Sequence, residues 1–219
     1  MDIITNSTVI QEFYDDIAYD YANEWYNNNS FSDILKSFMA LFPSSPKILD
    51  MGCGAGYHSM TLNSLGANVT GIDFSEKAIQ IAREKNPGCH FEIMDFRNIG
   101  RDLGCFDGII SIAAFIHIPG DDLSVIFKQI KSVLKRNGYL LPVINEGSGE
   151  SQFNFHSENN SKQYDFIAYF QDVNKLNELA CKNGLILIDE WKLPEEHSSR
   201  GWKCYLYQLN IEDNILYKP

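Results

Sequence analysis

From about residue 47, short apolar runs alternate with longer amphipathic segments along the chain. Short apolar runs bounded by turn residues are typical of buried strands, whereas apolar residues recurring at the helical period are typical of helices. Strands separated by single helices predict parallel pairing, because a parallel neighbour can be reached only through a crossover connection. The sequence therefore predicts an α/β fold with a doubly wound, mostly parallel, Rossmann-like sheet. The expected strands are 47–51, 68–73, 90–94, 106–112 and 138–144, and the expected helices between them are 57–66, 75–85 and 121–136.

Polar and turn-forming residues mark the expected ends of these helices. Asp73 and Ser75 are expected to cap the helix that follows the second strand. Asn137 and Gly138 are expected to end the last long helix of the core.

The segments on either side of the core predict a cap and a terminal hairpin. Two helical patterns precede the first strand within about forty residues, which is too short for a second domain. After the core, a helix leads to two apolar runs joined by a short loop, which predicts an antiparallel pair. We therefore expect one domain with an N-terminal helical cap (1–45), a cofactor-binding core (46–145), and a substrate-side insert, helix and hairpin (146–219).

The composition is that of a globular protein, since 44% of the 219 residues are hydrophobic and 13% are aromatic. A net charge of -11 disfavours nucleic acid and anionic membranes as partners. The densest basic stretch contains Lys128, Lys131, Lys135 and Arg136, and we interpret it as the solvated face of a helix.

Targeting signals and metal ligands are not evident in the sequence. No apolar run is long enough to span a bilayer, and the first residues are too acidic and polar for a signal or transit sequence. These features predict a cytoplasmic protein. The five cysteines contain no C-x-x-C pair, so we expect neither a disulfide framework nor a zinc site.

Three glycines directly follow the first predicted strand, in which Asp50 is the next-to-last residue. A glycine turn between a parallel strand and a helix brings backbone N–H groups and the helix N-terminus close to a bound ligand. We expect these amides to face an anionic group. The G-x-G-x-x-G fingerprint of dinucleotide-binding proteins requires a third glycine where this chain has Tyr57.

The spacing Asp50-x-Gly52-x-Gly54-x-Gly56 resembles the first motif of the class I S-adenosylmethionine-dependent methyltransferases. The resemblance continues downstream, because Asp73 ends the second predicted strand and Asp95 follows the third. Taken singly, each of these aspartates fits a helix cap equally well. Together they lie at one edge of the sheet, where doubly wound folds bind ligands.

The resemblance implies a seven-stranded sheet with an antiparallel last strand, and S-adenosylmethionine as the cofactor. In that family the second-strand acid holds the ribose hydroxyls, the third-strand acid meets the adenine amino group, and the fourth strand ends near the sulfonium. The segment 13–25 is similar to the N-terminal helix of small-molecule methyltransferases, in which a tyrosine covers the cofactor. Tyr14 and Tyr21 share a helix face, and packing against the sheet is the alternative role for both. The cofactor-binding residues implied are Asp50, Gly52, Gly54, Gly56, Asp73, Phe74, Asp95, Phe96, Ser111 and Tyr21.

Methyl transfer from a sulfonium is a direct displacement, so the protein mainly has to align the reacting atoms. An acceptor that must lose a proton gains from a general base, and histidine is the usual one. His117, just after the fourth predicted strand, lies where the family has its active-site mouth. The alternative is a histidine that only packs or caps the helix beginning near Asp121.

The methyl acceptor is expected to be a small molecule enclosed by the cap and by the insert after the fifth strand. An ordinary flexible loop is the alternative for the insert, which is rich in Ser and Asn. Its stretch 145–150 is similar to a segment of small, mostly uncharacterised methyltransferases, which also carry a tryptophan where this chain has Trp202, here with Arg200 close before it. The aromatic and polar residues of the insert that fit such a role are Glu146, Phe153, Phe155, His156, Tyr164 and Tyr169.

Three other functions remain open at this stage. A nicotinamide-dependent oxidoreductase shares the fold, but Tyr57 and Asp50 disfavour it. A binding or regulatory protein could keep the cofactor pocket without turnover, and a methyltransferase acting on a nucleic acid or a peptide would keep the chemistry. The net negative charge of the chain disfavours nucleic acid as the methyl acceptor. Both a monomer and a homodimer fit the sequence.

Overall fold

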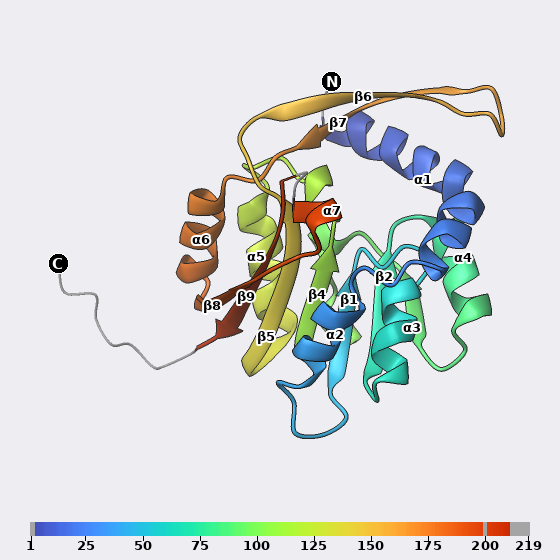
Figure 1. Ribbon diagram of the computed structural model, residues 1–219. Coiled ribbons are helices and arrows are strands. Elements are labelled where there is room, and N and C mark those ends of the chain that lie inside the picture. Colours follow the sequence, from blue (N-terminus) through green and yellow to red (C-terminus); the bar gives the residue numbers. More distant parts are fainter. Residues whose placement is uncertain (1–2, 199–200, 211–219) are drawn as a thin grey trace.

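The computed structural model describes residues 3–198 and 201–210 of the chain. Its centre is a seven-stranded sheet with the order β3-β2-β1-β4-β5-β9-β8 (Figure 1). The strands from β3 to β5 run parallel, and β9 pairs antiparallel with both β5 and β8. The predicted doubly wound sheet with an antiparallel last strand is therefore confirmed. The strands are β1 (Lys47–Met51), β2 (Asn68–Asp73), β3 (His90–Ile93), β4 (Phe106–Ile112), β5 (Leu134–Asn145), β8 (Leu185–Trp191) and β9 (Trp202–Leu209).

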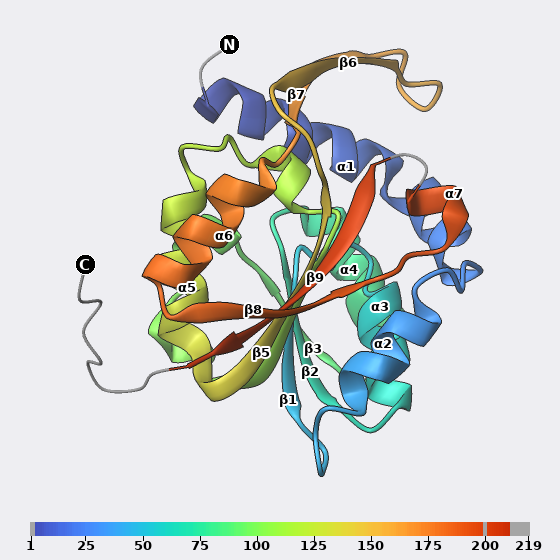
Figure 2. The same ribbon diagram turned by 60° about the vertical axis from the view of Figure 1, so that its left-hand side comes forward.

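Helices cover both faces of this sheet (Figures 1 and 2). Successive strand residues are buried on opposite faces, so Ile48 packs with Phe38 of α2 while Leu49 packs with Phe127 of α5. Burying one such side chain stabilises the fold by roughly 1.5–3 kcal/mol. The helices are α2 (Ser32–Met39), α3 (Tyr57–Ser64), α4 (Glu76–Lys85), α5 (Leu123–Val133), α6 (Val173–Lys182) and α7 (Glu195–Ser198), and the short 3-10 turns are η1 (Phe96–Asn98), η2 (Arg101–Leu103) and η3 (Phe115–His117).

Helix α1 (Ile3–Tyr26) lies across the carboxyl ends of the parallel strands and not on a face of the sheet (Figure 1). Its side chains are tied to the loops at that edge. Gln11 Nε2 donates to the Phe74 carbonyl at 2.8 Å, and Tyr26 Oη donates to the Ala55 carbonyl at 2.6 Å. The cap therefore covers the edge where doubly wound sheets bind ligands.

The insert after β5 is a two-stranded hairpin of β6 (Glu150–His156) and β7 (Gln163–Tyr169), which the sequence analysis did not predict. The hairpin extends along α1 in both views (Figures 1 and 2). Phe13 of α1 packs against Phe155, Tyr164 and Phe166, with ring centroids 5.1–5.7 Å apart. Alternate aromatic positions are a strand signal, which the high Ser and Asn content of the insert obscured.

Helix α5 ends at Val133, so the expected end at Asn137 and Gly138 is wrong. Leu134 already pairs with Phe106 of β4, and the strand register shifts directly afterwards. Asn137 has a φ of 61° within this irregular start of β5. Hydrogen bonding to β4 therefore overrides the helical pattern of the sequence here. Within the described ranges, no helix is both long and apolar enough to cross a bilayer.

Candidate active site

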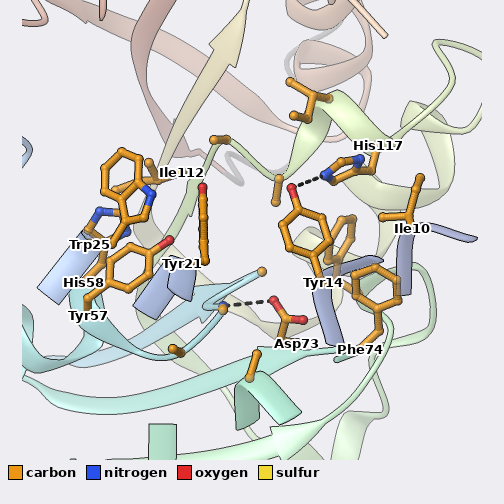
Figure 3. A pocket seen from close by; sticks show the side chains of 18 of the residues that line it. Ile10, Tyr14, Tyr21, Trp25, Tyr57, His58, Asp73, Phe74, Ile112 and His117 are labelled. Carbon is orange, nitrogen blue, oxygen red and sulfur yellow. Dashed lines mark hydrogen bonds between the residues drawn. The ribbon is translucent and has the colours of Figure 1, made fainter. Parts of the chain in front are cut away.

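A cavity of about 260 Å³ lies between α1 and the carboxyl ends of the parallel strands (Figure 3). Helix α1 contributes Tyr14, Tyr21 and Trp25 to its wall, and the loops after β2 and β4 contribute Asp73 and His117. The cavity is mostly apolar, with a few polar groups converging on it, as is typical of small-molecule sites.

The three loop glycines are required by the path of the backbone. Gly52, Gly54 and Gly56 have φ values of 79°, 53° and 84°, a region that other residues rarely adopt. A Cβ at Gly52 would lie 2.5 Å from Ala114 Cβ. A Cβ at Gly54 would meet nothing closer than Tyr57 Oη at 3.7 Å, and Gly54 lines the cavity. Gly54 therefore keeps space open for a ligand, whereas Gly52 allows close packing.

The amides of this loop do not face a ligand as the sequence analysis expects. The Gly52 and Cys53 amides both donate to the Ile72 carbonyl, at 2.9 and 3.0 Å. The Gly54 amide donates to Asp73 Oδ2 at 2.9 Å, and the Gly56 amide donates to the Cys53 carbonyl at 3.0 Å. The expectation is wrong for these four amides because the loop folds against the end of β2, which supplies acceptors for three of them.

Asp73 connects the glycine loop to the start of α4. Its Oδ2 accepts the Gly54 amide, and its Oδ1 accepts the Ser75 amide at 2.9 Å. Burial raises the pKa of Asp73, while the hydrogen bonds from the Ser75 and Gly54 amides oppose that shift. Ser75 itself caps α4 as predicted, since its hydroxyl accepts the Ala78 amide. Asp73 and the adjacent Phe74 both line the cavity (Figure 3).

Three of the predicted cofactor-binding residues do not line the cavity: Asp50, Gly56 and Ser111. Asp50 Oδ2 accepts a hydrogen bond from Ser59 Oγ at 2.7 Å. Ser111 Oγ donates to the Met51 carbonyl at 3.0 Å. These groups hold the strands and the loop in place.

Asp50 is fully enclosed, and burial raises its pKa to about 7, with Ser59 opposing the shift. A carboxylic acid whose folded pKa exceeds its unfolded value of 3.8 destabilises the fold progressively as the pH rises from that value through 7. We expect Asp50→Asn, which cannot ionise, to lose less stability on that rise. Urea unfolding at about pH 5 and about pH 8 measures how much free energy of unfolding each protein loses between these two pH values. That loss should be about 1–3 kcal/mol smaller for Asp50→Asn than for the wild type. An equal pH dependence for both would contradict the burial of an ionisable Asp50.

Asp95 and Phe96 line the cavity near the start of α1. The Asp95 carboxylate accepts the Arg97 amide at 2.9 Å and pairs with the Arg97 guanidinium at 2.5 Å. Arg97 Nη1 also donates to Ser7 Oγ on α1, at 2.8 Å. The sequence analysis missed Arg97, although an arginine two residues after the aspartate was a visible signal for such a pair.

His117 lies in η3 and is hydrogen-bonded to Tyr14 of α1, with 3.0 Å between Nε2 and Oη (Figure 3). Burial lowers the pKa of His117 to about 4 and raises that of Tyr14. Both groups are therefore uncharged at neutral pH. His117 Nδ1 is buried without a hydrogen-bond partner. The structure thus places His117 at the cavity, as the sequence predicts, and adds Tyr14 as its partner.

Tyr21 stands between Tyr14 and Trp25 along α1 (Figure 3), with ring centroids 6.1 and 5.8 Å away. The predicted shared face of Tyr14 and Tyr21 is confirmed. Trp25, missed by the sequence analysis, continues that face four residues on. Tyr57 and His58, at the start of α3, also line the cavity and were not predicted to do so.

The expected acceptor wall is not formed by the insert. Phe155 and Tyr164 pack on Phe13 of α1, and Phe153 is 48% exposed. Strand β7 of the hairpin is fixed to α1 by two hydrogen bonds. Asn6 Nδ2 donates to the Ile167 carbonyl, and the Ile167 amide donates to Asn6 Oδ1. Trp202 does line the cavity, and Arg200 lies outside the described residues. The six insert residues absent from the cavity wall are Glu146, Phe153, Phe155, His156, Tyr164 and Tyr169.

The core of the chain is similar to known proteins. Residues 48–138 match the family model described as "Methyltransferase domain". The ubiquinone biosynthesis O-methyltransferase of Xanthomonas axonopodis pv. citri is 30% identical over 105 residues, which are 46% of this chain and 43% of that protein. The probable S-adenosyl-L-methionine-dependent methyltransferase TehB of Haemophilus influenzae is 26% identical over 175 residues, covering 73% of this chain and 59% of that one. The match thus spans less than half the length of the first of these relatives.

Solved structures share the fold over nearly the whole chain. Magnesium protoporphyrin IX methyltransferase from Synechocystis PCC 6803, with bound SAH, superposes with a TM-score of 0.69 at 17% identity, covering 93% of this chain and 98% of that one. The 1,6-didemethyltoxoflavin-N1-methyltransferase of Burkholderia thailandensis gives a TM-score of 0.70 at 15% identity, with 96% and 91% covered. At these identities the likeness establishes the fold.

Proposed function

We propose that this protein is a class I methyltransferase that transfers a methyl group from S-adenosylmethionine to a small-molecule acceptor, and that residues 48–138, which match the methyltransferase family model, are its core. The observation that carries the proposal is the covered cavity at the carboxyl edge of the sheet, with Asp73, Asp95 and Gly54 in its wall. Both structural relatives named above were solved with the spent cofactor bound.

The residues present fit an S-adenosylmethionine molecule in an extended pose. Asp73, which lines the cavity, would offer carboxylate lone pairs to the two ribose hydroxyls. The same negative charge would repel a phosphate group at this position. Phe74, Asp95 and Phe96 flank the adenine end, and Gly54 leaves room for the amino-acid tail. When bound, the sulfonium supplies a methyl group that is already activated for displacement.

The chain's own task is to hold the acceptor in line and to take its proton. Alignment can contribute roughly 7–11 kcal/mol to lowering such a barrier. With the cofactor bound, an acceptor oxygen or nitrogen would bond to the methyl carbon as the carbon–sulfur bond breaks, and a neutral thioether would be the leaving group. The acceptor's proton then has to leave as well.

We assign proton removal to the Tyr14–His117 pair, because both side chains line the cavity and Tyr14 Oη is hydrogen-bonded to the imidazole (Figure 3). In the tautomer with the proton on Nδ1, Nε2 accepts the Tyr14 hydroxyl. The acceptor's proton passes to Tyr14 Oη as the tyrosine proton passes to Nε2. A pKa of about 4 keeps the imidazole neutral over the whole physiological range, so it can accept a proton there, as a weaker base than an ordinary histidine.

The test is ligand-dependent melting with the two competing cofactors. A ligand at a hundred times its dissociation constant stabilises a protein by roughly 2.7 kcal/mol, which raises the melting temperature by several degrees. We expect that shift with S-adenosylhomocysteine (SAH) and none with NAD. The opposite pattern would establish the oxidoreductase instead.

A further inference from the structure

The cavity has two chemically different ends. One end holds the charged side chains Asp73, Asp95 and Arg97, and the other, here called the aromatic end, is built from rings. Figure 3 shows Asp73 and Phe74 on one side of Tyr21, and Trp25, Tyr57 and His58 on the other. The aromatic end consists of Trp25, Phe31, Tyr57, His58, His197 and Trp202.

The rings of the aromatic end are held by one another. Trp25 stacks on Tyr57, with centroids 5.6 Å apart and planes 20° from parallel, and on Phe31 at 6.2 Å and 29°. Phe31 in turn packs against His197 of α7 at 4.8 Å. Four separate elements of the chain thus form one rigid apolar wall, which suits a flat ligand better than a flexible one.

Two polar atoms in this wall, Trp25 Nε1 and His197 Nε2, are buried without a well-aligned hydrogen bond. Glu196 Oε1 lies 3.4 Å from His197 Nε2 but outside hydrogen-bonding geometry, and it accepts Ser30 Oγ. The Tyr21 hydroxyl interacts with the Trp25 side chain, which partly offsets the rise of the Tyr21 pKa on burial. Buried polar groups are normally well satisfied, so an indole N–H on a cavity wall without an aligned acceptor points to a ligand that bears one.

The aromatic end also lacks charge. Among the described residues that line the cavity, the carboxylates and the guanidinium all belong to the other end. Burial lowers the pKa of His58 to about 3, so this ring is neutral as well. An ionised acceptor placed here would lose its hydration without gaining a counter-charge.

We propose that the aromatic end binds the methyl acceptor, and that this acceptor is a small, uncharged aromatic molecule whose hydroxyl or ring nitrogen accepts the Trp25 N–H. The inference rests on the proposed function and names its substrate class. The apolar body of the acceptor would lie against Ile112 and Trp202, with its reacting atom toward the middle of the cavity, where the cofactor would present its methyl group.

The test uses three catechols that differ mainly in the charge of their side group: 4-methylcatechol (uncharged), protocatechuate (anionic) and dopamine (cationic). Their dissociation constants are measured by ligand-observed NMR on SAH-saturated protein. We expect the uncharged catechol to bind at least about tenfold more tightly than either charged one. Trp25→Phe and His197→Phe, which keep a ring and lose the polar atom, should each weaken that binding by up to about tenfold.

Trp191→Phe is the matched control, because Trp191 carries an N–H bonded to Asp189 outside the cavity and should leave all three constants unchanged. Binding of SAH without binding of the uncharged catechol, or with a preference for a charged one, would overturn this inference and spare the proposed function. So would a Trp25→Phe protein that loses SAH affinity while the catechol affinity is unchanged, since the indole would then hold the cofactor's tail. Failure of SAH itself to bind would overturn both.

Discussion

The Asp73→Ala protein should lose about two orders of magnitude or more in affinity for SAH. A ribose diol makes two hydrogen bonds to this carboxylate in the proposed pose, and each bond to a charged group is worth about 1.5–3 kcal/mol. Isothermal titration calorimetry of the wild-type and variant proteins measures the difference directly.

The change also removes the acceptor of the Gly54 and Ser75 amides, so a structural effect has to be separated from a binding effect. Asp107→Ala is a suitable comparison, because Asp107 likewise accepts a backbone amide, that of Lys47, but at the opposite edge of the sheet. We expect Asp107→Ala to lower stability and to leave SAH affinity unchanged. Unchanged SAH affinity in a folded Asp73→Ala protein would contradict the assignment of Asp73 to the cofactor.

His117→Ala should reduce methyl transfer by about 10²- to 10⁴-fold, the range for loss of a general base, with little change in SAH affinity. Tyr14→Phe should cost a similar factor, because the proton reaches the imidazole through the Tyr14 hydroxyl. The double variant should be scarcely slower than either single one, since residues acting as a unit are not additive. Turnover is followed as SAH release with the acceptor that binds at the aromatic end.

The pH dependence separates this role from a structural one. A base acts when deprotonated, so with a pKa of about 4 the wild-type rate should rise through that pH and stay level across neutral pH. His90→Ala, at an exposed histidine of β3 that pairs with Glu92, should leave the rate unchanged. A rate step near the ordinary histidine value of 6.5, or full turnover in His117→Ala, would remove His117 from the mechanism.

The sequence predicts the parallel strands and one edge of the cavity because both follow from local patterns. The end of each parallel strand must lie at the same edge, so Asp73, Asp95 and His117 come together without any further information. The alternation of short apolar runs and amphipathic segments fixes that arrangement before any tertiary contact is known.

Other features depend on contacts between distant segments. The loop amides could not be assigned, because their acceptors are the Ile72 carbonyl and the Asp73 carboxylate of a different strand. The aromatic end could not be predicted either, since its rings come from five segments that are distant in the sequence: α1, the residue before α2, α3, α7 and β9. The β6–β7 hairpin was missed because polar composition outweighed a short alternating pattern.

The central claim is that the cavity beneath α1 holds S-adenosylmethionine. Calorimetric titration of the folded wild-type protein with SAH tests it most directly. The account predicts saturable binding of one SAH per chain. A folded protein that releases or absorbs no heat of binding across this titration, at any temperature tried, would contradict it.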